Sequence, residues 1–177
     1  FSLDFNGRDS LNAEGNLPVY LSLTDSVKIL DPEEPIYINI RSESIPIAIF
    51  ISNITQIPEV GGLFQCDLTI ENSLNNPKIN GVFQIKDGVL RYPHWGIDYD
   101  QIELNLLARD DKFSLERFQI NSNGGKVISS GTIQFDFDNL NQSIVYSDLS
   151  LMADNFLLLQ HKEFEMQMSA DIKYQMV

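Results

Sequence analysis

The chain has 177 residues, of which 43% are hydrophobic, and its 12 basic and 25 acidic residues give a net charge of −13 at pH 7. This length and hydrophobic content predict a single folded domain, residues 1–177, and exclude a disordered tail. Because the net charge repels phosphate backbones and anionic membrane surfaces, the composition argues against nucleic acid as a partner.

Most of the sequence is predicted to form β-strands, because apolar and polar residues alternate between turn residues. In chain order the predicted strands are Phe1–Phe5, Val19–Leu23, Ile36–Ile40, Leu63–Ile70, Ile79–Ile85, Gln101–Arg109, Lys112–Ile120, Lys126–Phe137, Ile144–Met152 and Phe164–Met176. One segment differs: between Pro46 and Pro58, apolar residues recur at near-helical spacing, which indicates a short helix or a bent strand.

The connections between these strands are short and rich in turn residues. They include Asn75-Asn76-Pro77, Asp110-Asp111, Asn123-Gly124-Gly125 and Asp138-Asn139. Short connections predict antiparallel hairpins in a meander. The apolar alternation changes parity between Leu115 and Phe118, which predicts a bulge or a twist near Arg117. A weak internal repeat is also present, in which Gly62, Gly81 and Gly131 are each interpreted as opening a strand.

The sequence does not contain a recognisable catalytic or metal-binding motif. The two histidines, His94 and His161, lack the spacing of a zinc site. Asp110-Asp111 lacks the ligand spacing of an EF-hand and is better interpreted as a hairpin turn. Ser129-Ser130-Gly131 does not match a nucleophile elbow. We therefore expect a protein that is not an enzyme and that needs no cofactor or metal.

Two further features concern single residues. Cys66 is the only cysteine, and its place between Phe64 and Leu68 predicts a buried thiol without an intrachain disulfide. The segment Tyr92–Gly96 gathers the only tryptophan, a tyrosine and a histidine. It is interpreted as a loop folded against one end of the sheet, with an exposed contact patch as the alternative.

No targeting or membrane-spanning segment is apparent in the sequence. The longest apolar run, Ile45 to Ile51, is far shorter than the roughly 20 residues that span a bilayer. The first residues lack the basic, apolar and small-residue order of a signal peptide. Both ends fall within alternating stretches, so we expect an excised piece of a longer protein.

Three pieces of the sequence, taken together, resemble a known family. They are Leu74-Asn75-Asn76-Pro77-Lys78-Ile79-Asn80-Gly81, Ile85-Lys86-Asp87-Gly88-Val89-Leu90-Arg91-Tyr92-Pro93, and Gly96-Ile97-Asp98-Tyr99 leading into Ile102-Glu103-Leu104-Asn105-Leu106. In this order and spacing they resemble the C-terminal repeat region of the TamB family, whose relatives include AsmA-like and bridge-like lipid-transfer proteins. The likeness extends from Gly15 to Phe137.

The resemblance implies an all-β fold in which a curled antiparallel sheet forms a taco-like half-barrel with an apolar interior groove. The residues alone allow an ordinary sandwich with a dry core equally well. The resemblance also implies a piece of a larger, repeat-built protein in the periplasm of a Gram-negative bacterium, anchored in the inner membrane. Its implied partners are phospholipid acyl chains, shielded in transit between the inner and outer membranes.

Two other functions remain open at this stage. The family also implies an assembly factor for outer-membrane or autotransporter β-barrel proteins, which would act with a BamA-family partner through an exposed strand edge. A purely structural spacer is the third reading.

The predicted groove lining is the apolar side of the alternating strands, since alternate residues of a strand point to one face. It comprises Phe64, Leu68, Ile70, Ile79, Phe83, Ile85, Ile102, Leu104, Leu106, Phe113, Leu115, Ile133, Phe135, Phe164, Met166, Met168 and Ile172.

Overall fold

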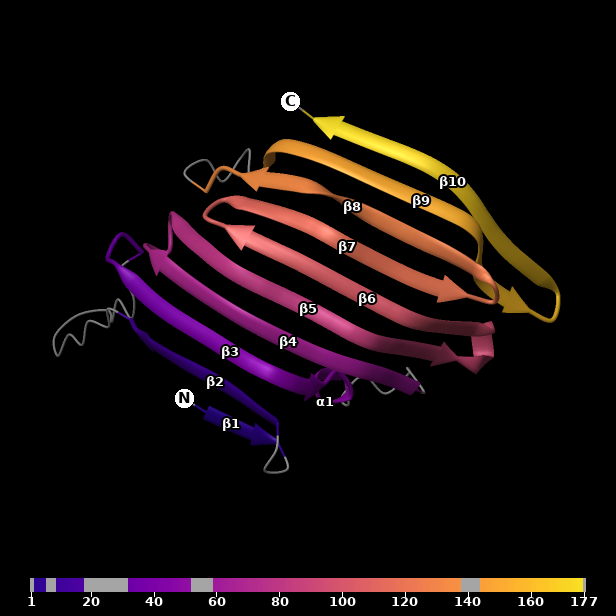
Figure 1. Cartoon of the computed structure of the whole chain (residues 1–177), viewed down its shortest axis with the longest axis horizontal. Helices are drawn as coiled ribbons and strands as arrows, with labels where there is room; N and C mark the ends of the chain where they lie inside the picture. Colours follow the sequence, from indigo (N-terminus) through magenta and orange to yellow (C-terminus); the bar gives the residue numbers. More distant parts are fainter. Residues whose placement is uncertain (1, 6–8, 18–31, 52–58, 138–143, 177) are drawn as a thin grey trace, which may run out of the picture.

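A computed structural model describes residues 2–5, 9–17, 32–51, 59–137 and 144–176. These residues form one antiparallel sheet of ten strands, in which each strand pairs only with its neighbours in sequence (Figure 1). The strands are β1 (Ser2–Phe5), β2 (Asp9–Asn16), β3 (Ile36–Pro46), β4 (Glu59–Asn72), β5 (Pro77–Tyr92), β6 (Ile97–Arg109), β7 (Lys112–Ser122), β8 (Gly125–Phe135), β9 (Ile144–His161) and β10 (Phe164–Met176). A helical turn, α1 (Ala48–Ile51), and a 3-10 turn, η1 (Pro93–Trp95), complete the described elements.

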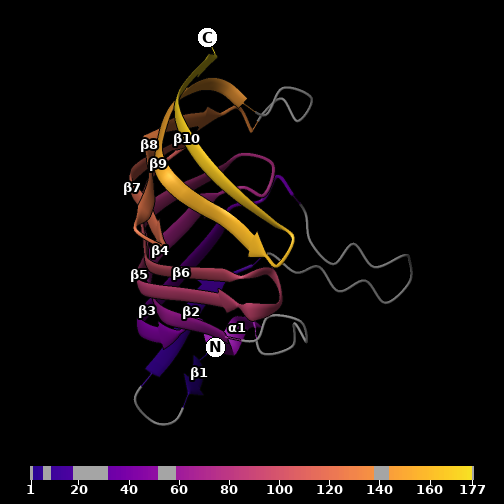
Figure 2. The ribbon, with the colours of Figure 1, turned by 90° about the vertical axis from the view of Figure 1, so that its right-hand side faces the viewer.

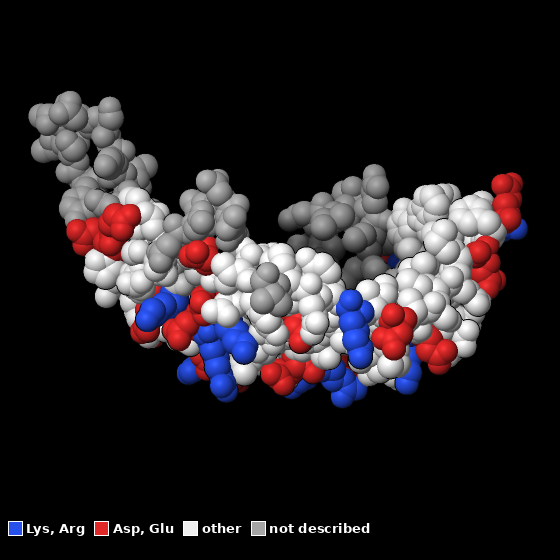
Figure 3. All heavy atoms as spheres, turned by 90° about the horizontal axis from the view of Figure 1, so that it is seen from above, with Lys and Arg blue, Asp and Glu red and all other residues white. Residues whose placement is uncertain are grey.

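The sheet is open, with β1 and β10 as its edges, and it is neither closed nor strongly curled. Viewed edge-on, it is a shallow crescent whose convex side carries most of the visible charged side chains (Figure 3). The all-β antiparallel meander is therefore confirmed. The strong curl is wrong, and so is the sandwich, because no second sheet covers the first among the described residues.

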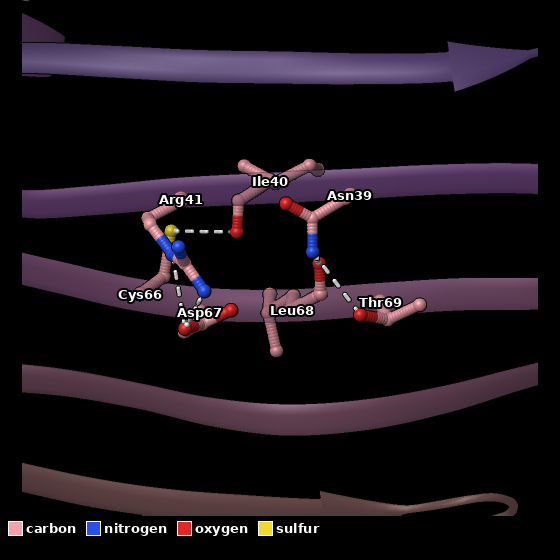
Figure 4. A network of polar contacts seen from close by, with 7 residues as sticks. All are labelled: Asn39, Ile40, Arg41, Cys66, Asp67, Leu68 and Thr69. Atoms are coloured by element: carbon pink, nitrogen blue, oxygen red, sulfur yellow. Dashed lines mark hydrogen bonds and ion pairs between the residues drawn. The ribbon is translucent and has the colours of Figure 1, made fainter.

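Alternation sorts the side chains onto the two faces, as expected for paired strands. On one face, Phe64 lies opposite Ile85, and Ile85 lies opposite Leu104. On the other face, Arg41 forms an ion pair with Asp67 at 2.7 Å (Figure 4). We call these the apolar face and the polar face. Helix α1 lies over the apolar face, on the side of the sheet seen to the right in Figure 2.

The predicted bulge in β7 is confirmed. Leu104 pairs with Phe118 and Leu106 with Leu115, so one extra residue of β7 lies between the two pairs. The same shift recurs where β7 pairs with β8. The bulge keeps Leu115 and Phe118 on one face in spite of their odd spacing.

Several strand boundaries differ from the prediction because turn-type residues lie inside strands. The strand predicted to end at Ile85 continues to Tyr92, with Asp87 at a φ of 52° beside a register shift. The strand predicted to end at Met152 continues to His161 through Asn155, whose φ is 45°. Asn and Asp tolerate a left-handed backbone conformation, and such a residue can occupy a β-bulge as well as a turn.

Other predictions fare unevenly. Strand β10 and the turns at Asp110-Asp111 and Asn123-Gly124 are confirmed, whereas β2 was missed because Leu11 is its only large apolar residue. The glycines at 62, 81 and 131 lie inside strands, so the reading that each opens a strand is wrong. The predicted strand Val19–Leu23 and turn Asp138-Asn139 lie outside the described residues. The predicted helix is described only over Ala48–Ile51.

The best-packed part of the molecule lies where β9 reaches past the end of β8 toward β6. Phe156 is 4% exposed and joins Val127 and Ala153 in a cluster of buried side chains. The Tyr99 hydroxyl donates a hydrogen bond to the Leu158 carbonyl at 2.6 Å. Burial raises the pKa of Tyr99. This hydrogen bond joins β6 to β9, two strands that do not pair directly.

Candidate functional site

The apolar face crosses most of the sheet in continuous rows of paired residues. One row runs through Ile45, Phe64, Ile85, Leu104, Phe118, Ser129, Leu151 and Ile172, each directly opposite the next. The adjacent row contains Cys66, Phe83, Leu106, Leu115, Gly131 and Leu149. Because opposite residues share a face, these rows form one apolar surface on the side opposite the ion pairs.

A hollow of about 420 Å³ lies on this surface near α1. It is lined by Leu11, Ile40, Ile47, Phe50, Phe64, Cys66, Leu68, Phe83 and Ile85. The Phe64 ring contacts Phe83 with ring centres 4.9 Å apart, and Phe50 of α1 contacts Phe64 at 5.5 Å. None of the lining side chains is charged, so the hollow suits an apolar ligand and offers nothing to orient a polar reactant.

Cys66 lies in the floor of the hollow and is 4% exposed, as its sequence context predicted. Burial raises the pKa of its thiol, an effect that outweighs the hydrogen bonds with Ser42. A thiol that stays protonated is a poor nucleophile. Cys66 therefore acts as a small apolar side chain in this site.

The structure brings most of the predicted lining residues together on the apolar face. These are Phe64, Leu68, Ile70, Ile79, Phe83, Ile85, Ile102, Leu104, Leu106, Phe113, Leu115, Ile133, Phe135 and Ile172. The edge strand β10 is less enclosed than the prediction assumed. Met168 packs against the cluster around Phe156, but Phe164, Met166 and Ile172 are 47%, 48% and 51% exposed.

Sequence reasoning missed several residues of the face. Phe118, Leu149 and Leu151 belong to the two rows described above, and Ile40 pairs with Leu68 on the same face. The alternation that identified the others would have found these four. Leu11 and Phe50 could not be found in this way, because they reach the hollow from a strand that was not predicted and from a helical turn.

The segment around η1 packs against β9, next to the hydrogen bond between Tyr99 and Leu158. A Cβ on Gly96 would meet the Gln160 carbonyl oxygen of β9 at 2.0 Å, so the two backbones touch. The His94 ring lies between Trp95 and His161, with centres 5.8 Å and 6.5 Å away. Trp95 is still 43% exposed. The loop is therefore folded against the sheet, as interpreted, while its tryptophan keeps a solvent-facing side.

Two other hollows have several acidic residues in their lining, and neither is arranged to hold a metal ion. One contains Asp110, Asp111 and Asp136 beside Lys78, and the other contains Asp98 and Asp100. Asp98 is held by Arg91 at 3.0 Å. Within the described residues, no group of three or more His, Cys, Asp or Glu side chains is placed to hold a metal ion.

Comparison with models of protein families, with curated proteins and with solved structures found no match to this chain. Among the described residues, the helices are too short or too polar for any to cross a membrane.

Proposed function

We propose that the apolar face shields the acyl chains of phospholipids from water, as a segment of a TamB-like envelope protein in the periplasm. The observation that supports this function is the apolar face itself, which runs across neighbouring strands and is covered by no second sheet in the described part of the chain. An exposed apolar surface of this extent marks a binding surface.

The energetics favour such a surface as a path for lipid. Moving an acyl chain through water exposes about 0.8 kcal/mol per methylene, or roughly 12 kcal/mol for a chain of ~15 methylenes. Contact with Phe, Ile and Leu side chains removes water from the chain and so lowers this barrier. The polar head group stays in water, beside the open face.

The predicted taco-like groove takes the form of a shallow trough in this proposal. The hollow near α1 accommodates part of an acyl chain between Phe50 and Phe83. The rows of paired residues then continue the apolar contact across the sheet toward β9. The charged residues of the polar face keep the opposite side hydrated.

A second function is supported by a different observation: within the described sheet, β10 has a hydrogen-bonded partner strand on one side only. An open strand edge can add a strand from another protein by main-chain hydrogen bonds. This supports the alternative of an assembly factor for outer-membrane β-barrel proteins that acts with a BamA-family partner.

Photo-crosslinking distinguishes the two functions. A crosslinking residue at Leu106 or Ile133 should capture phospholipid in cells, whereas one at Glu103 or Gln134 should not. Glu103 contacts Arg117 on the polar face, and Gln134 neighbours Ile133 on the opposite side of β8. Equal capture at both sets would refute the lipid path. Capture of a nascent barrel protein would favour the assembly factor, and capture of neither would favour the spacer.

Substitution at Phe83 tests the hollow directly. Phe83→Arg places a charged side chain among apolar neighbours, so binding of a fluorescent phospholipid to the purified protein should fall at least about tenfold. Val82→Arg is the matched control, because Val82 lies on the other face, opposite Asp67. Circular dichroism should show that both variants keep the sheet. Similar lipid binding by both variants would remove the hollow from the proposal.

A further inference from the structure

The hairpin turn between β7 and β8 consists of Asn123 and Gly124. Ser122 pairs with Gly125, so these two residues form the whole loop, and their φ values are 46° and 84°. Asn-Gly is a preferred sequence for such a two-residue turn. It is also the sequence in which asparagine loses its side-chain amide most readily. Glycine has no Cβ to hinder the attack of its own backbone nitrogen on the asparagine side chain.

The reaction needs only water. The Gly124 nitrogen gives up its proton and bonds to Cγ of Asn123, and the side-chain nitrogen takes up a proton and leaves as ammonia. Water then opens the cyclic imide at either of its carbonyl carbons, which gives aspartate or isoaspartate. Isoaspartate routes the main chain through the former side chain. It therefore lengthens the backbone by a methylene and leaves a new carboxylate.

The structure leaves Asn123 free to react. Asn123 and Gly124 are both exposed. Among the described residues, neither the Asn123 side chain nor the Gly124 N–H has a hydrogen-bond partner. A Cβ on Gly124 would have no heavy atom within 4 Å, so the turn has room to change conformation as the imide closes.

The pair Asn80-Gly81 has the same sequence but the opposite surroundings. It lies inside β5, between β4 and β6. The Asn80 side chain accepts a hydrogen bond from the Asp110 N–H at 3.2 Å. A Cβ on Gly81 would lie 1.9 Å from a carbonyl oxygen of β4, so the backbone there has no room to move. A third pair, Asn6-Gly7, lies outside the described residues.

Both residues next to the turn hold the end of β9. Ser122 is 2% exposed, and its hydroxyl donates a hydrogen bond to the Leu157 carbonyl at 2.8 Å. The Gly125 backbone touches β9, because a Cβ on it would lie 2.0 Å from the Asn155 carbonyl oxygen. A longer backbone between Ser122 and Gly125 moves these two contacts relative to each other. The new carboxylate also adds a like charge to a hollow that two aspartates already line.

From these observations we propose that Asn123 is a site of spontaneous deamidation, and that isoaspartate there loosens the end of β9 from the sheet. The end of β9 contains Phe156 and Leu158, which belong to the cluster of buried side chains or pack against it. A slow chemical change in an exposed turn therefore acts on the best-packed part of the molecule. This inference does not depend on the proposed lipid function, since it rests on the turn and on β9 alone.

Peptide mapping tests the site. The purified protein is incubated in mildly alkaline buffer at physiological temperature, and mass spectrometry with electron-transfer fragmentation locates aspartate and isoaspartate. In the folded protein Asn123 should convert at least about tenfold faster than Asn80, because Asn80 reacts only when β5 opens. In concentrated urea the two should convert at comparable rates, since both precede glycine. An unreactive Asn123 in the folded protein, or equal conversion of Asn80, would overturn the proposal.

Hydrogen exchange tests the consequence. In the isoaspartate form, isolated by anion exchange, amides of residues 155–161 should exchange faster than in fresh protein, while those of β5 stay unchanged. Asn123→Asp is the matched control. It carries the new charge without the longer backbone, so it should keep the protection of residues 155–161. Unchanged exchange in the isoaspartate form, or the same loss in Asn123→Asp, would overturn the proposed effect on β9.

Discussion

At the scale of single residues, Phe156 joins parts of the sheet that do not pair directly. It is 4% exposed, lies in the cluster with Val127 and Ala153, and its ring centre is 5.1 Å from that of Tyr99 on β6. The cluster is small, because a single-layer sheet has no second layer to bury its remaining apolar residues. Stability is therefore concentrated in a few side chains.

Replacing Phe156 by alanine should be strongly destabilising. Loss of a buried phenyl ring costs about 3–5 kcal/mol in free energy of unfolding, which urea denaturation measures directly. Met152→Ala in the same strand is the control: Met152 is 52% exposed, so its loss should change stability by about 0.5 kcal/mol or less. Equal effects would show that the cluster is not the main core.

At the scale of elements, the long strands depend on backbone positions that few residues can occupy. Gly81 lies inside β5 at a φ of 137°, and a Cβ there would lie 1.9 Å from the Asp67 carbonyl oxygen of β4. Gly124, in the turn between β7 and β8, has a φ of 84° but open space around it. The first glycine is required by both conformation and space, the second by conformation alone.

Replacing Gly81 and Gly124 by alanine, one at a time, separates the effect of backbone conformation from the effect of space for a Cβ. Gly124→Ala should cost about 1 kcal/mol for the left-handed conformation alone. Gly81→Ala should cost well above about 2 kcal/mol, because β4 and β5 must also move apart. Chemical denaturation of both variants provides the comparison. Equal losses would mean that the close approach of β4 to β5 relaxes without cost.

The sequence predicted where most strands lie and which residues share a face better than it predicted where each strand ends. Alternation located β10 and the bulge near Arg117 because side-chain parity is directly visible in the residues. It failed at Asp87 and Asn155, since the residue types that permit a tight turn also permit a bulge. The residues of the apolar face were largely predictable for the same reason as the strands. The contribution of Phe50 was not, because it depends on where a helical turn meets the sheet.

At the scale of the whole molecule, the central strands of an open sheet are more stable than its edge strands, because they have a partner on each side. Strands β4 to β8 are flanked by long partners on both sides, whereas β1 has four residues and, among the described strands, one neighbour. The curl of the sheet was not predictable from alternation, because alternation assigns residues to faces but does not set how far the sheet bends. Bending depends on twist and bulges summed over many strands.

Hydrogen exchange should reveal this gradient. Amides of β5 and β6 should exchange only through global or near-global opening, whereas those of β1 and β2 should exchange through local fraying. Mass spectrometry of peptic fragments would show protection rising from β2 to β5. Uniform protection across the sheet would indicate that it opens as a single cooperative unit.

The sequence-ordered pairing of the strands gives the sheet an additive architecture. Since each strand contacts mainly the ones before and after it, a hairpin can be duplicated or lost without rerouting any other strand. Contacts that are close in sequence also form early and quickly during folding. The width of the apolar surface can therefore change over evolutionary time in steps of one hairpin, at little topological cost.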